Sequence, residues 1–79
     1  MALLISVLPI GDGWTVRSDK LDNDLIFKAG ARAEAAARAL AQRLAAAGAD
    51  AEVRIFLRDG ALAGAFSHPA QRDDLALAS

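Results

Sequence analysis

The chain has 79 residues and a mass of 8.2 kDa, which is enough for one small domain but too little for a second independent core. Hydrophobic residues make up 54% of it, but 20 residues are alanines, so large apolar side chains are fewer than the percentage suggests. A net charge of -1 gives no overall attraction to phosphate backbones or anionic lipid, and the lack of cysteine excludes disulfides and thiolate metal sites.

The apolar run at the start of the chain, Met1 to Leu8, is too short to span a bilayer. It has neither a basic leading segment nor a small-residue cleavage pattern, so we expect a cytoplasmic protein with no membrane partner. Residues 1–70 are predicted to form a single α+β domain. Residues 71–79 have two adjacent aspartates and little large apolar surface, and they are predicted to form a flexible tail.

Two strands joined by a tight turn are predicted first. The aliphatic run Leu3–Ile10 ends at Gly11-Asp12-Gly13, and glycine tolerates the positive φ that tight hairpins need. Residues Trp14–Ser18 then alternate between apolar and polar, as a half-buried strand does. After a polar loop, the stretch Leu25–Phe27 is β-prone, and the sequence leaves open whether it forms a strand.

One helix is predicted between Gly30 and Gly48, because this segment is rich in good helix formers and contains no proline or internal glycine. Gly48 can supply the left-handed residue that ends it. At ~100° per residue, the apolar positions expected to face the core form one stripe: Ala33, Ala36, Ala37, Leu40, Leu44 and Ala47. The positions expected opposite the stripe are Arg38, Gln42 and Ala46.

A second hairpin is predicted after the helix. The segment Ala51–Leu57 alternates again, and Asp59-Gly60 is a strong signal for a two-residue turn before a last strand at Leu62–Phe66. Such a turn sets these pairs: Arg58 with Ala61, Leu57 with Leu62, Phe56 with Ala63, Ile55 with Gly64 and Arg54 with Ala65. We therefore predict an antiparallel four-stranded sheet in the chain order β-β-(β)-α-β-β, with one helix packed on one face.

Strand alternation divides the large apolar residues between the two faces of this sheet. The face under the helix is predicted to receive Val53, Ile55, Leu57, Leu62 and Phe66, and also Val7, Pro9, Trp14 and Val16. Leu4, Leu8, Ile10 and Phe56 fall on the opposite face, which a single helix cannot cover. An apolar patch of this kind usually marks a contact surface. The predicted interaction surface consists of Leu4, Leu8, Arg17, Arg54, Phe56 and Arg58.

The order of several short motifs resembles the small bacterial domain-of-unknown-function family 2188. Trp14 and Val16 follow the first turn, the alanine-rich helix comes next, and then come Arg58-Asp59-Gly60 and Ser67. The likeness covers the chain from about Val7 to Pro69. This resemblance implies a small α+β domain, and it brings no activity, substrate or catalytic residue.

The sequence offers only weak catalytic and metal-binding candidates. His68 is the single histidine, and Ser67 beside it should point to the opposite face of an extended segment. Asp19, Asp22 and Asp24 could gather oxygens around a cation, but their spacing lacks the glycine and the closing glutamate of an EF-hand loop. We predict no catalytic residue, no metal site and no cofactor.

These patterns favour a small non-enzymatic interaction module that self-associates as a homodimer through the open sheet face or an edge strand, and they leave contact with another protein open. The alternative is binding of single-stranded nucleic acid, since Arg17, Arg54 and Arg58 could hold phosphates while Phe56 stacks on a base. Glu52 on the same face and the sequence pI of about 5.6 weigh against this alternative, and so does the prediction of only one aromatic residue, Phe56, on that face.

Overall fold

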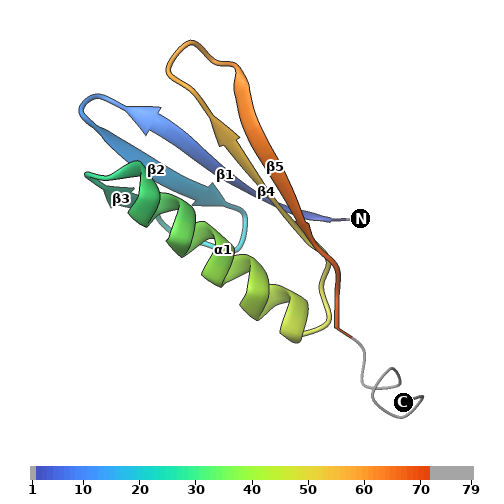
Figure 1. The fold of residues 1–79 in the computed structure, drawn as a ribbon. Coiled ribbons are helices and arrows are strands. Elements are labelled where there is room, and N and C mark those ends of the chain that lie inside the picture. Colours follow the sequence, from blue (N-terminus) through green and yellow to red (C-terminus); the bar gives the residue numbers. More distant parts are fainter. Residues whose placement is uncertain (1, 72–79) are drawn as a thin grey trace.

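Five strands form one sheet and a single helix packs on one of its faces in residues 2–71, which the computed structural model describes (Figure 1). The elements are β1 (Leu3–Ile10), β2 (Gly13–Ser18), β3 (Leu25–Phe27), α1 (Gly30–Ala46), β4 (Ala51–Phe56) and β5 (Leu62–His68). The predicted α+β class is therefore confirmed. The predicted tail, residues 71–79, lies outside the described residues except for Gln71, whose backbone N–H donates to the carbonyl of Ala45 (2.8 Å).

The sheet is mixed and has the strand order β3-β2-β1-β4-β5, which corrects the predicted four-stranded antiparallel sheet. Its central pair, β1 and β4, is parallel, and the other three neighbouring pairs are antiparallel. The parallel pair follows from the path of the chain. β3 runs in the direction of β1, and α1 carries the chain back to the end of the sheet where both begin, so β4 starts in the same direction.

Leu25–Phe27, which the sequence left open, forms the edge strand β3 and pairs with β2. Gly13 permits this pairing, because a Cβ at that position would lie only 2.6 Å from the carbonyl oxygen of Phe27. A side chain on Gly13 would therefore force the two strands apart.

The first hairpin has the predicted register. Gly11, with φ of +46°, and Asp12 form a two-residue turn, and Val7 pairs with Val16 while Pro9 pairs with Trp14. These four residues therefore share one face, as strand parity predicted.

The second hairpin differs from the prediction at its turn. The N–H of Leu57 donates to the carbonyl of Ala61 (2.8 Å), and Gly60 has φ of +89°, so Arg58, Asp59 and Gly60 form a three-residue loop. Phe56 therefore pairs with Leu62 rather than with Ala63, and an irregularity between Ile55 and Phe56 absorbs one extra residue. The longer loop and the extra residue of the bulge shift the pairing in opposite directions. Beyond the bulge these shifts cancel, and the predicted pairs of Ile55 with Gly64 and of Arg54 with Ala65 are confirmed.

The core lies between α1 and the sheet. Its largest fully buried aliphatic side chains are Ile5, Val7, Val16 and Val53. The helix contributes mostly alanines at four-residue spacing, and its buried residues are Ala33, Ala37, Leu40, Ala41 and Ala45. Because these side chains are small, the helix backbone can approach the sheet closely.

The predicted helix stripe is confirmed at its centre and wrong at its end. Ala36 and Leu44 are half-buried, while Ala47 is the exposed C-cap residue. Gly48 has φ of +96° and ends the helix, as predicted. Of the apolar residues assigned to the covered face in the second hairpin, Val53 is buried and Ile55 half-buried, but Leu57, Leu62 and Phe66 are exposed. The bulge pairs Leu62 with Phe56 and so moves it to the face away from α1.

Candidate interaction surface

The face of the sheet turned away from α1, called the open face from here on, receives residues from all five strands. Ile5, Val16 and Val53 are buried on the helix side of the sheet. Because side chains alternate along a strand, the residues next to them point to the open face. Its members are Leu4, Ser6, Leu8 and Ile10 of β1, Thr15 and Arg17 of β2, Ile26 of β3, Glu52, Arg54 and Phe56 of β4, and Leu62, Ala65 and Ser67 of β5.

Large aliphatic side chains on the open face remain in contact with water. Leu4 is 43% exposed, Ile10 39% and Ile26 63%. The two other apolar residues of the predicted surface, Leu8 and Phe56, are half-buried by their neighbours on the same face. The helix covers none of these residues, so an apolar patch persists on the isolated chain.

Two arginines lie on the open face, and each is paired with a carboxylate. Arg17 Nε donates to Asp24 Oδ2 (3.0 Å), and Arg54 Nε donates to Glu52, its neighbour but one on the same strand. The Arg54–Glu52 pair lies within one strand of one chain. Asp24 was not expected as the partner of Arg17, because its position depends on the path of the loop before β3.

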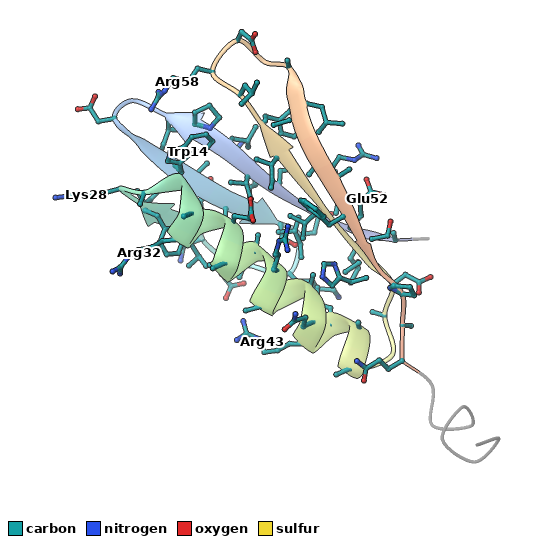
Figure 2. The ribbon with its side chains drawn as sticks, viewed as in Figure 1. Trp14, Lys28, Arg32, Arg43, Glu52 and Arg58 are labelled. Carbon is teal, nitrogen blue, oxygen red and sulfur yellow. The ribbon has the colours of Figure 1, made fainter. Side chains whose placement is uncertain are left out.

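Arg58 is the one residue of the predicted surface that the structure separates from the others. It lies in the three-residue loop between β4 and β5, where its Nη1 donates to the carbonyl of Gly11 (2.7 Å). Its guanidinium carbon is 5.9 Å from the centre of the Trp14 ring, and Trp14 lies on the helix side of the sheet (Figure 2). Arg58 therefore bridges the tips of the two hairpins rather than bordering the open face.

Ile26 and Leu62 are apolar surface residues that sequence reasoning did not place on the open face. Ile26 follows from the strand status of β3, which pairs it with Thr15. Leu62 is 53% exposed and pairs with Phe56 because of the bulge. A definite assignment of Leu25–Phe27 as a strand would have placed Ile26 on the open face, but no local sequence signal indicates the position of Leu62.

Thr15 is a buried polar residue on the otherwise accessible open face. Only 1% of it is exposed, and its Oγ1 has no hydrogen-bond partner among the described residues. Its cross-strand neighbours on this face are Leu8 and Ile26. The apolar cluster on this face is therefore dense enough to exclude water from a hydroxyl.

The two edges of the sheet differ in length and charge. β3 has three residues and lies between Asp24 and Lys28. At the opposite edge, β5 has seven residues and carries no charged side chain from Leu62 to Ser67 (Figure 1). An edge of this second kind is a template for pairing with another strand.

The sequence neighbours Ser67 and His68 point to opposite faces. Ser67 pairs with Glu52 on the open face, and His68 pairs with the buried Ala51 on the helix side. The structure therefore does not bring this serine and this histidine together as a nucleophile and a base. Within residues 2–71 no group of three or more acidic or histidine side chains could hold a metal ion.

Comparison of the chain with models of protein families, with curated proteins and with solved structures found no match. The resemblance to family 2188 stays a prediction. Among residues 2–71 no helix has both the length and the apolar character needed to cross a membrane.

Proposed function

We propose that the chain is a small, non-enzymatic interaction module that associates with a second copy of itself through the open face or the β5 edge. The observation that carries this proposal is the exposure of Leu4, Ile10 and Ile26 on a face that the single helix leaves uncovered. Burial of such side chains releases water from apolar surface, at roughly 25 cal/mol per Å².

The small core supports association with a second copy. Its fully buried large side chains are few, and alanines supply most of the helix contribution. Domains of this size commonly need a disulfide, a metal or oligomerisation for stability. The chain has no cysteine, and the described residues contain no metal cluster, so oligomerisation is the device that remains.

The charge distribution also suits self-association. The net charge of -1 produces little repulsion between two copies. Arg17 and Arg54 on the open face are each neutralised by a carboxylate within the same chain, so bringing two such faces together does not oppose unpaired like charges.

Binding of single-stranded nucleic acid remains the weaker proposal. Both arginines of the open face already hold carboxylates, and its only aromatic residue, Phe56, is half-buried. Cations without a salt bridge to any described residue project instead from α1 and the segment just before it, at Lys28, Arg32 and Arg43 (Figure 2). An oligonucleotide that binds the open face at low salt, with affinity falling steeply as salt rises, would favour this alternative.

A pair of matched variants tests the proposed function. Leu4→Lys places a charge on the open face, whereas Gln42→Lys places the same charge on an exposed position of α1. We expect sedimentation velocity to show a dimer for the wild type and for Gln42→Lys. Association through the open face predicts a shift toward monomer for Leu4→Lys, whereas association through the β5 edge predicts that Leu4→Lys stays dimeric. Equal sedimentation of all three chains as monomers would contradict the proposal.

A further inference from the structure

Among residues 2–71, one side of the β5 backbone has no neighbouring strand. Leu3 N–H donates to the carbonyl of Asp50 (2.8 Å), so Asp50 directs its peptide groups toward β1. Because successive residues of a strand direct these groups to opposite sides, Ala51, Val53 and Ile55 direct theirs toward β5. Their partners on β5 are His68, Phe66 and Gly64, which direct their own groups back toward β4.

The intervening residues Ala65 and Ser67 therefore present their N–H and C=O groups to the outer edge of the sheet. Among residues 2–71 no strand lies beyond β5 to receive them. The regular part of this edge is bounded on one side by the bulge next to Ala63 and on the other by Pro69, which cannot donate a hydrogen bond. Five residues, 64–68, remain available for regular pairing.

We infer that β5 pairs antiparallel with β5 of a second copy, so that Phe66 lies opposite Phe66 of that copy and the two sheets become one. This inference rests on the proposed self-association and assigns it to the β5 edge in one register. Leu4, Ile10 and Ile26 lie on β1 and β3, away from β5, so this edge contact does not use them. In this register Ala65 lies opposite Ser67 of the other copy. The two-fold axis generates a second, equivalent pair, in which Ser67 lies opposite Ala65 of the other copy. Each pair exchanges two hydrogen bonds, so all four outward-facing residues of the dimer are satisfied.

A two-fold axis at Ala65 is the competing register, and it is less favourable. In that register Ala65 lies opposite Ala65 of the other copy, and Ser67 lies opposite Ala63 of the other copy, which is the bulged residue. Only one regular hydrogen-bonded pair then forms at the centre, and the groups of Ser67 lose their partners. The Phe66-centred register uses the whole regular edge.

The side chains around the axis fit a second copy. Phe66 is 37% exposed, and in the proposed register its ring lies next to the same ring of the partner, so both lose contact with water. Arg38 lies over the Phe66 ring at 4.0 Å from its centre, and it also pairs with Glu34 (3.4 Å). The two cations nearest the axis are therefore each accompanied by a carboxylate, so their mutual repulsion is reduced.

The length of the edge sets the expected strength. Five paired residues extend over about 17 Å, and an interface of this length buries less than roughly 1,200 Å² unless neighbouring surfaces join it. We therefore expect reversible association, with a Kd on the order of micromolar.

Single cysteines test the register, because the chain contains none of its own. In the proposed dimer the Cα atoms of two copies of residue 66 lie about 4.5 Å apart, within the range of a disulfide, whereas two copies of residue 65 are diagonal neighbours at about 7–8 Å. We expect Phe66→Cys to form a covalent dimer under mild oxidation roughly tenfold faster than Ala65→Cys or the helix control Gln42→Cys.

A proline variant tests the edge without depending on a cysteine. Ala65→Pro removes an outward N–H and keeps the bonds between β4 and β5, while Ala65→Ser retains that N–H. We expect Ala65→Pro to be monomeric at concentrations where the wild type and Ala65→Ser are dimeric, with circular dichroism showing that all three chains are folded.

The possible failures can be told apart. If the wild type is dimeric, but Leu4→Cys crosslinks while Phe66→Cys does not, and Ala65→Pro stays dimeric, the edge inference is overturned and self-association through the open face stands. Faster crosslinking of Ala65→Cys than of Phe66→Cys would overturn the register. A wild-type chain that is monomeric throughout the micromolar range would overturn both the inference and the proposed function.

Discussion

Both faces of the sheet carry large aliphatic residues, but the residues on the two faces differ in burial. On the helix side, Ile5, Val7, Val16 and Val53 are fully buried beneath alanines of α1. On the open face, Leu4, Ile10 and Ile26 alternate with paired charges and stay exposed. The difference shows that strand parity assigns a residue to a face, whereas the position of the single helix decides which face becomes the core.

The largest expected contrast is between the adjacent residues Ile5 and Leu4. Ile5→Ala should lower the free energy of unfolding by about 2–5 kcal/mol, because it leaves a cavity under the helix. Leu4→Ala should cost less than about 1 kcal/mol in the monomer, since its side chain is already in contact with water. Urea denaturation of dilute protein measures both values, and equal losses would show that the two faces are not distinguished as described.

Gly13 and Gly64 differ in how closely neighbouring atoms would lie to an added Cβ. Gly13→Ala should cost about 1–3 kcal/mol, because the new Cβ would meet the Phe27 carbonyl and displace β3. Gly64→Ala should change stability by less than about 0.5 kcal/mol, since its Cβ would make ordinary contact with the Phe66 ring at 3.5 Å. Thermal or urea unfolding of both variants checks this, and tolerance of alanine at Gly13 would contradict the close pairing of β2 with β3.

Thr15 tests how dry the apolar cluster of the open face is. Thr15→Val should raise the free energy of unfolding by about 1 kcal/mol, because it replaces a buried hydroxyl that has no partner among the described residues with a methyl group. Thr15→Ser, which keeps the hydroxyl and loses the methyl group, is the control and should be less stable than the wild type. A loss of stability in Thr15→Val would mean that the hydroxyl is hydrogen-bonded.

The smallest effect is expected for the ion pair of Arg17 and Asp24. The side chain of Arg17 is 61% exposed and that of Asp24 is 39% exposed, so a double-mutant cycle with alanine at each position should give a coupling of about 0.2–1 kcal/mol. The coupling should fall further in high salt because exposed charges are screened. A coupling well above this range that persists in high salt would show that the open face is more enclosed than the structure indicates.

The elements predicted correctly from the sequence are those with local signals. Gly11-Asp12 sets the register of the first hairpin, and the alanine-rich segment from Gly30 with Gly48 at its end determines the helix. Five of the six residues predicted for the interaction surface lie on the open face, because alternation from one correct register fixes the parity of every residue in a strand.

The errors arose where distant segments meet. The parallel pairing of β1 with β4 depends on the end of the sheet at which the chain leaves the helix, and no residue in either strand indicates that pairing. Arg58 was misplaced because Asp59-Gly60 also suits a three-residue loop, with Gly60 as its left-handed residue. Asp24 was missed as the partner of Arg17 because its position depends on a loop without a strong turn signal.

The mass of the intact wild-type chain in solution tests the central claim most directly. Light scattering across the micromolar range should show the mass rising with concentration from 8.2 kDa toward about twice that value. A mass that stays at 8.2 kDa at every concentration would contradict the account, because neither the open face nor the β5 edge would then bind a second copy.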